Sequence, residues 1–274
     1  MTIEPILVLE HLRKSFPQRG GGAPVVAVDD VSLSVGAGKT LALVGESGSG
    51  KSTLARLAQR LIDPDEGQIV LRGLDLTHLT GRRLREQRIA MQPIFQDPST
   101  SFNPRRTVGG ALLQALWRTP SATRIRCAEE LLERVRLRPA SFYLPRFPHE
   151  LSGGQRQRLA IARAIAMDPV LVIADEPLSG SDVSIRSQML NLLADLQKER
   201  GIAYLLITHD ISIARAFADR VAVMYRGRLV EEGDPAVVLR DPSHEYTKRL
   251  LGAVPQLAGA AVPAWTSIHE RTRT

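Results

Sequence analysis

Cysteine is almost absent from this sequence. Cys127 is the single cysteine among 274 residues, which excludes an intramolecular disulfide and any metal cluster held by several cysteines. A chain without disulfides suits a reducing compartment. We therefore expect Cys127 to be inert and the protein to work inside the cell.

Long apolar runs are missing as well. No stretch approaches the roughly 18 apolar residues that cross a membrane, and no signal-type N-terminus is visible. Apolar residues still make up 43% of the chain, enough to fill the core of one large domain or two modest ones. We expect a cytosolic protein that reaches a membrane only through other subunits.

Aromatic residues are scarce, at 4% of the chain, and basic residues form no long run. The chain is nevertheless basic, because 36 lysines and arginines outnumber 29 acidic residues and leave a net charge of +7. Surfaces that bind single-stranded nucleic acid combine basic grooves with stacking aromatics. Since the arginines here are scattered, we expect a solvated basic surface and no functional nucleic-acid binding.

What the sequence does contain is a glycine-rich loop between a strand and a helix. Residues 41–44 are all apolar, as in a strand covered on both faces, and residues 54–61 predict a helix. A flexible turn that happens to contain a lysine is the alternative, but the flanking elements favour a nucleotide-phosphate site. The loop, which matches G-x-x-x-x-G-K-[ST], consists of Gly45, Glu46, Ser47, Gly48, Ser49, Gly50, Lys51, Ser52 and Thr53.

The residue types in this loop suit phosphate binding. Glycines let successive backbone N–H groups turn towards phosphate oxygens, and the helix N-terminus adds partial positive charge. Lys51 can then reach the β- and γ-phosphates of a nucleotide, and the Ser52 hydroxyl can bind Mg²⁺. A nucleotide and Mg²⁺ are therefore the expected ligands.

A second apolar run, residues 170–174, predicts a buried strand that ends in Asp175 and Glu176. Phosphate-loop NTPases hold Mg²⁺ with a carboxylate delivered in this way, and we assign that role to Asp175. Glu176 is then placed to polarise water as a general base.

Two further polar side chains follow predicted strands. Gln96 comes after the stretch 89–95, where its amide can bind Mg²⁺ or hold the attacking water, although an ordinary loop residue is the alternative. His209 follows residues 204–208, a third predicted buried strand. Because ligands bind at the carboxyl ends of strands in α/β sheets, we favour a functional His209 over a structural one.

A second helix entry has the features of an anion site. Ser152 is the expected N-cap of a helix over 156–167, and Gly153, Gly154 and Gln155 expose backbone donors before it. An ordinary loop-to-helix junction is the alternative. Phe16, at a strand end, is a candidate for stacking on adenine, with simple packing as its alternative.

Hydrophobic periodicity places the remaining elements. It predicts strands at 3–15, 25–35 and 68–72, and a strand pair, 221–225 and 228–231, joined by Arg226 and Gly227. It predicts helices at 82–88, 107–137, 185–200, 234–240 and 244–251, followed by a loose tail at 255–274. No internal repeat is visible.

Over about residues 4–255 these motifs resemble the ATP-binding subunit of ATP-binding-cassette transporters. The most specific is Leu151-Ser152-Gly153-Gly154-Gln155-Arg156-Gln157-Arg158, which other phosphate-loop families lack. The resemblance implies the following roles: Walker A loop for Gly45–Thr53, Q-loop glutamine for Gln96, Walker B strand for Leu171–Glu176, D-loop aspartate for Asp182, switch histidine for His209 and A-loop aromatic for Phe16.

Residues 95–105 and 241–251 look like the oligopeptide, dipeptide and nickel importer branch of that family. Many subunits of the branch carry a C-terminal cysteine cluster that this chain lacks, which implies the partner type without the cluster. The chain departs from the family at Gly180-Ser181, where Ala-Leu is usual, and at Lys39, where Glu is usual. The first change implies looser communication between two sites, and the sequence suggests no role for Lys39.

The resemblance implies an α/β fold: a phosphate-loop ATPase core with a small antiparallel β subdomain and a helical subdomain inserted at about 97–158. Residues 1–240 are then the nucleotide-binding domain, and 241–274 an extension of oligopeptide-transporter type. Two cassettes would sandwich two ATP molecules, each held by Walker A of one subunit and residues 152–155 of the other.

The implied function is ATP hydrolysis that energises import of di- or oligopeptides, at the cytoplasmic face of the inner membrane. Expected partners are two permease subunits, a second and different ATPase subunit and, indirectly, an extracytoplasmic substrate-binding protein. Nickel or opine import is the alternative within the branch. A soluble cassette ATPase acting on nucleic acid or ribosomes is the alternative from another class, disfavoured by the single cassette and short insertion.

Overall fold

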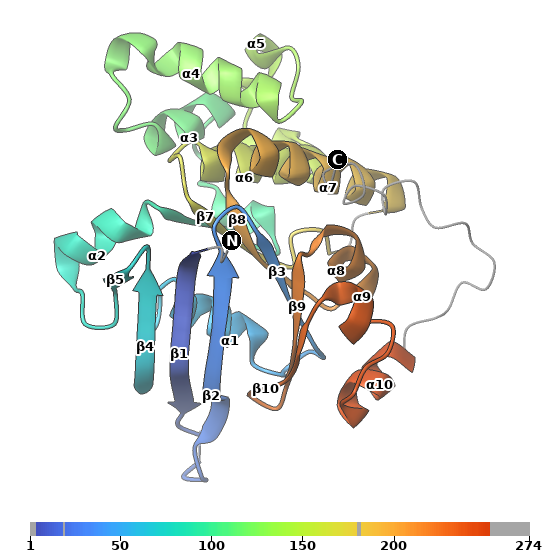
Figure 1. The fold of residues 1–274 in the computed structure, drawn as a ribbon. Coiled ribbons are helices and arrows are strands. Elements are labelled where there is room, and N and C mark those ends of the chain that lie inside the picture. The colour runs from blue at the N-terminus through green and yellow to red at the C-terminus, as the bar shows by residue number, and fades with distance from the viewer. Residues whose placement is uncertain (1–3, 19, 180–181, 253–274) are drawn as a thin grey trace.

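The computed structural model describes residues 4–18, 20–179 and 182–252 (Figure 1). It contains a four-stranded antiparallel sheet in the order β2-β1-β4-β5 and a six-stranded sheet in the order β10-β9-β3-β8-β7-β6. Helices pack around the larger sheet and form a separate group above it (Figure 1). The expected α/β class, with its small antiparallel sheet and helical insertion, is confirmed.

The antiparallel sheet is built by alternation of apolar and polar residues. In the pairing of β1 with β2, Leu9 lies opposite Leu33 and Leu12 opposite Val31, and these four side chains are buried. β5 was not predicted, because two residues are too short for an alternating pattern. The strands are β1 (Pro5–Phe16), β2 (Val25–Gly36), β4 (Glu66–Leu71) and β5 (Leu74–Asp75).

The larger sheet is parallel except at one edge, where β10 pairs antiparallel with β9. Arg226 and Gly227 join these two strands with φ values of 47° and 83°, the left-handed pair typical of a two-residue hairpin. The predicted strand pair is therefore confirmed. The strands are β3 (Thr40–Val44), β6 (Met91–Ile94), β7 (Leu171–Asp175), β8 (Ala203–Thr208), β9 (Arg220–Tyr225) and β10 (Arg228–Gly233).

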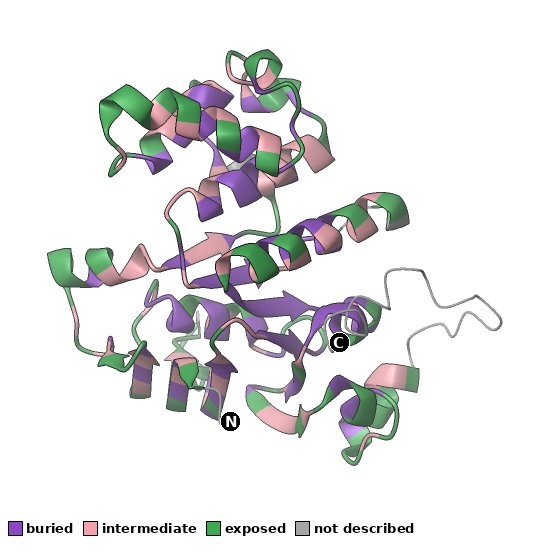
Figure 2. Ribbon diagram, turned by 45° about the horizontal axis from the view of Figure 1, so that its top comes forward, coloured by how far each residue is buried: buried purple, intermediate pink, exposed green. Residues whose placement is uncertain are grey.

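The central strands of this sheet divide their side chains between two cores. In β8, Leu205 and Ile207 join a core that includes both sheets, whereas Tyr204 and Leu206 join a core made with the helices. Figure 2 shows these strands as mostly buried, and the exception in β7 is Asp175 at its end. Because both faces are covered, each strand reads as a continuous apolar run in the sequence.

Among the helices, α1 follows the glycine-rich loop and buries Leu54 and Leu57 in the core that joins the two sheets. α5 and α8 were not predicted. The helices are α1 (Lys51–Ala58), α2 (Gly81–Arg88), α3 (Val108–Ala115), α4 (Ser121–Arg134), α5 (Ala140–Tyr143), α6 (Gly153–Ile165), α7 (Val183–Arg200), α8 (Ile211–Phe217), α9 (Pro235–Val238) and α10 (Glu245–Gly252), with short 3₁₀ turns at Pro98–Ser101 and Pro148–Glu150.

The helical group α3–α5 packs on the large sheet through α6 and α7. Leu112 of α3, Leu132 of α4 and Leu159 of α6 share one core with Val172 of β7 and Leu206 of β8. We call α6 the signature helix, because the motif of residues 151–158 continues into it. This helix therefore connects the insertion with the strand that carries Asp175.

The C-terminal helices pack on the same sheet. Tyr246 of α10 and Val238 of α9 share a core with Val44 of β3 and Val223 of β9. The predicted tail at 255–274 lies outside the described residues. Within the described ranges, none of the helices has the length and apolar character needed to span a membrane.

Candidate nucleotide site

Three neighbouring parallel strands end at one edge of the large sheet. Val44 of β3 lies opposite Thr208 of β8, and Asp175 of β7 lies opposite Ile207 of β8. The glycine-rich loop, the two carboxylates and His209 therefore emerge side by side. Carboxyl ends of parallel strands are where α/β sheets bind ligands.

The phosphate loop, residues 45–53, needs glycine at two positions. Gly45 has φ of 153°, and a Cβ there would lie 2.2 Å from the carbonyl oxygen of Met224. Gly50 has φ of 106°, and its Cβ would lie 2.1 Å from the carbonyl oxygen of Ala27. The backbones of β2 and β9 thus approach the loop too closely for any side chain.

Lys51 lies inside this loop and is 5% exposed. Its Nζ donates hydrogen bonds to the carbonyl oxygens of Gly45 and Glu46, both at 2.7 Å. Burial lowers the pKa of Lys51, opposed by the charges of Glu176 and Asp175. An ammonium group that bonds only neutral oxygens keeps its charge available for phosphate oxygens that enter the loop, so the loop fits ATP.

Ser52 and Asp175 supply oxygen atoms beside the loop. The Ser52 hydroxyl donates to Asp175 Oδ1 at 3.3 Å, and burial raises the pKa of Asp175, against the effect of this hydrogen bond. The described residues include no group of three or more His, Cys, Asp or Glu arranged to hold a metal. A hydroxyl and one carboxylate fit Mg²⁺, which binds few protein oxygens and keeps waters and substrate phosphates as further ligands.

Glu176 contacts two other residues that were predicted from separate motifs, Gln96 and His209. Its Oε2 accepts a hydrogen bond from Gln96 Nε2 at 3.0 Å, and its Oε1 lies 3.0 Å from His209 Nδ1. Glu176 has a left-handed φ of 45°, a conformation found more often at active sites than elsewhere. Its backbone N–H donates to Ile207 O at 2.9 Å, which holds the carboxylate at the sheet edge.

Residues 152–155 form the N-terminus of α6, with Ser152 as its N-cap. The Ser152 hydroxyl accepts from Gln155 N at 3.3 Å, and Gln155 Oε1 accepts from Ser152 N at 2.9 Å, which forms a capping box for α6. In the described part of the chain, no hydrogen bond or ion pair joins this segment to the phosphate loop. Its exposed Gly153 has open space where a Cβ would stand.

Asp182 and Phe16 also lie apart from the Glu176 cluster. Asp182 caps α7, where its carboxylate accepts from Ile185 N at 2.9 Å, while Gly180-Ser181 lies outside the described residues. Phe16 ends β1, is 39% exposed and has Lys14 Nζ 5.8 Å from its ring centre. Its strand partner Val25 is two residues from Ala27, the β2 residue that approaches the phosphate loop.

The sequence reasoning missed two supports of this site. Tyr246 of α10 accepts a hydrogen bond from Glu46 N at 2.9 Å; its sequence segment was noticed, but no local pattern indicates that contact. Lys39, for which the sequence suggested no role, pairs with Asp219 Oδ1 at 2.9 Å, and Asp219 Oδ2 accepts from Thr40 N at 2.9 Å. These bonds hold the start of β3 against the start of β9.

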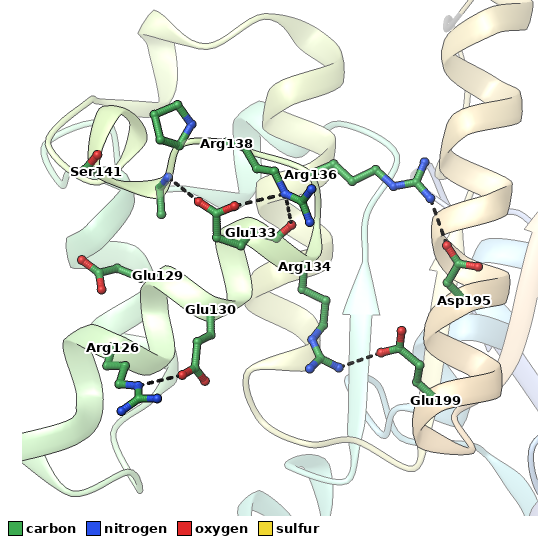
Figure 3. Close-up of a pocket in the computed structure, with 12 residues that line it drawn as sticks. Arg126, Glu129, Glu130, Glu133, Arg134, Arg136, Arg138, Ser141, Asp195 and Glu199 are labelled. Atoms are coloured by element: carbon green, nitrogen blue, oxygen red, sulfur yellow. Dashed lines mark hydrogen bonds and ion pairs between the residues drawn. The ribbon is translucent and has the colours of Figure 1, made fainter.

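A hollow of about 910 Å³ lies between α4, α5 and α7 (Figure 3). Its arginines are all paired with acidic side chains, among them Arg134 with Glu199 at 2.8 Å and Arg136 with Asp195 at 3.0 Å. We call it the charged hollow; it is lined by Arg126, Glu129, Glu130, Glu133, Arg134, Arg136, Arg138, Pro139, Ala140, Ser141, Asp195 and Glu199. Because none of the phosphate-loop residues lines it, it is not the nucleotide site.

Comparison with solved structures identifies cassettes of the same architecture. A dimeric ATP-binding cassette in a post-hydrolysis state, bound to ADP and Pi, superposes with a TM-score of 0.76 at 28% identity, over 84% of this chain and 98% of that one. A cbiO1 structure from Clostridium perfringens, part of the ABC transporter complex cbiONQ, gives a TM-score of 0.76 at 29% identity. The match covers 87% of this chain and 92% of that one.

Sequence comparison leads to the same group. The probable peptide ABC transporter ATP-binding protein y4tS of Sinorhizobium fredii is 46% identical over 260 residues, covering 92% of this chain and 73% of that protein. The glutathione import ATP-binding protein GsiA of Salmonella paratyphi A is 46% identical over 263 residues, and the chain spans 41% of its length. Residues 28–179 match the family described as ABC transporter. The chain therefore belongs to the ABC transporter family.

Proposed function

We propose that this chain is an ATP-hydrolysing subunit that energises an importer of di- or oligopeptides. The observation that carries the proposal is Glu176, held by Gln96 and His209 beside a loop that fits MgATP. Two similar proteins are named for peptide transport and glutathione import, and glutathione is itself a small peptide. Together, site and relatives support ATP-driven peptide import.

In the proposed reaction, the backbone of the phosphate loop and Lys51 bind the phosphates. Ser52, Asp175 and Gln96 would hold Mg²⁺, which when bound neutralises phosphate charge. With its amide nitrogen on Glu176, Gln96 keeps its carbonyl oxygen for the metal. Glu176 accepts the proton of the attacking water. A hydrogen bond from His209 Nδ1 to Glu176 Oε1 keeps that carboxylate turned towards the water.

The proposal includes a second ATPase subunit. Ser152, Gly153, Gly154 and Gln155 form a helix N-terminus that, within this chain, makes no bond to the phosphate loop in the described residues. Such an N-terminus favours anions, so it would complete the site by facing the γ-phosphate held by another subunit. Asp182 would act at the boundary between the two ATPase subunits. Phe16 would stack on the adenine. The chain has no cysteine cluster, which favours a different, cluster-bearing partner over a second copy.

A groove lined by residues 101–103, which follow Gln96 in the chain, would receive a permease subunit. It has a volume of about 740 Å³, and its lining includes Phe102, Trp117 and Arg163. Trp117 is 56% exposed, and large aromatics are frequent anchors of protein interfaces. Arg163, in the signature helix α6, bonds the carbonyl oxygen of Ser101 and lies 5.0 Å from the Phe102 ring. A permease bound in this groove would therefore contact residues 101–103, which follow Gln96, and also α6.

We propose residues 1–240 as the nucleotide-binding domain, with the helical subdomain at about 97–158, and residues 241–274 as the extension. The chain would bind peripherally to the cytoplasmic face of the inner membrane through two permease subunits. An extracytoplasmic substrate-binding protein would act on it indirectly, through those permeases.

Co-purification with ATPase assays tests this function. Alone, the chain should be largely monomeric with low activity. Activity should rise with the sister ATPase and two permeases, and rise again with a peptide-loaded binding protein. Ser152→Arg should block the site formed with the partner's Walker A loop and leave ATP binding to this chain's own loop intact. A fully active homodimer without membrane partners would contradict the proposal.

A further inference from the structure

The phosphate loop has a support that comes from the C-terminal end of the described chain. Tyr246 lies in α10, 200 residues after Glu46, yet its hydroxyl accepts a hydrogen bond from the backbone N–H of Glu46 at 2.9 Å. Tyr246 is 2% exposed. The second residue of the loop is therefore bonded to a side chain that packing holds in place.

The ring of Tyr246 is held by the same hairpin that touches the loop. It stacks on Tyr225, the last residue of β9, with ring centres 4.0 Å apart and planes inclined by 25°. Two residues further on, Gly227 N donates to Ser49 O at 2.9 Å. Burial raises the pKa of the Tyr246 phenol, so the hydroxyl stays neutral at physiological pH.

The same peptide unit of the loop is bonded on both sides. Its carbonyl, on Gly45, accepts from Lys51 Nζ at 2.7 Å, and its N–H, on Glu46, donates to Tyr246. A peptide unit is planar, so its C=O and N–H turn together. Rotation of this unit would break both bonds. The hydrogen bond to Tyr246 therefore also holds in place the Gly45 carbonyl to which Lys51 is bonded.

We propose that Tyr246 is a positioning residue for nucleotide binding, because it keeps the 45–46 peptide oriented so that Lys51 stays directed into the loop. This inference rests on the proposed function, since it assumes that ATP binds there. Without the hydroxyl, a smaller fraction of molecules has the competent loop, and apparent affinity falls by that fraction. The net worth of one such hydrogen bond corresponds to about a twofold to tenfold change.

The test compares Tyr246→Phe with a matched control, Tyr204→Phe. Tyr204 is 1% exposed, and its hydroxyl donates to Leu193 O at 3.1 Å; it lies near the amino end of β8, away from the loop. Both variants lose one buried phenol hydroxyl and keep the ring. The measurements are the Kd for MgATP by titration calorimetry, hydrogen exchange of the Glu46 amide and the Tm.

In Tyr246→Phe we expect MgATP affinity to fall about twofold to tenfold, with faster exchange at Glu46. In Tyr204→Phe we expect a lower Tm with wild-type affinity and exchange. Unchanged affinity in Tyr246→Phe, or equal weakening in both variants, would overturn the inference. Wild-type protein that binds no MgATP would instead overturn the proposed function, and the inference with it.

Discussion

The nucleotide site and the charged hollow both gather cations and carboxylates, yet they differ in burial and in pairing. In the nucleotide site Lys51 is 5% exposed and bonds carbonyl oxygens instead of a carboxylate. In the hollow, Arg134 and Glu199 pair at 2.8 Å with 40% and 54% of their side chains exposed. Figure 3 shows Arg134 and Arg136 facing Glu199 and Asp195 of α7.

This difference distinguishes a charge that can bind a ligand, such as that of Lys51, from charges that are already neutralised by an ion pair, such as those of the hollow. An exposed ion pair is solvated and contributes about 0–1 kcal/mol to stability. A buried or half-buried charge whose pKa is shifted, as for Lys51 and Asp175, is kept at a cost in stability and is typical of functional sites. The volume of the hollow is therefore no guide to the functional site. Burial and the direction of the pKa shifts instead indicate the edge of the large sheet where Lys51 and Asp175 lie.

The largest expected effect distinguishes Glu176 from the carboxylates of the hollow. Glu176→Gln should lower kcat of the assembled transporter by about 10²–10⁴-fold while MgATP still binds, because the base is lost and the phosphate loop is intact. Glu199→Gln is the matched control and should leave kcat unchanged. Steady-state phosphate release measures both. Near-wild-type turnover in Glu176→Gln would end the assignment of Glu176 as base.

An intermediate effect is expected for the cation of the loop. Lys51→Ala should weaken nucleotide binding by about tenfold to a hundredfold, the range for losing a hydrogen bond to a charged group. The control is Lys39→Ala, whose ammonium pairs with Asp219 at 2.9 Å outside the loop. Equilibrium binding of a fluorescent ATP analogue reports the difference. Equal weakening of nucleotide binding in both variants would show that loss of a lysine acts by destabilising the fold and not by removing a phosphate contact.

The smallest effect is expected in the hollow itself. Replacing Arg134 and Arg136 together by Gln removes the two pairs to α7 and should cost about 0–1 kcal/mol per pair, a shift of a few degrees in Tm. ATP affinity should not change. Arg126→Gln, in an exposed pair with Glu130 within α4, is the control. A marked loss of ATP affinity in the double variant would give the hollow a role at the nucleotide site.

Most of the fold was predictable because its strands are buried on both faces. Residues 41–44, 170–174 and 204–208 stand out as apolar runs, and all three became central parallel strands. α8 was missed: it is a seven-residue helix whose buried residues give no clear apolar stripe. β5, with two residues, carries no pattern at all.

The sequence by itself determined the local chemistry: a glycine loop with Lys51 and Ser52, and carboxylates placed after an apolar strand. These follow from residue type and spacing, which act within a few residues of each other. That Gln96 and His209 both reach Glu176 was decided by the tertiary structure, because the order of strands in the sheet sets which ends are neighbours. The Tyr246 bond to Glu46 was decided there too, since packing brings together residues 200 positions apart that share no local signal.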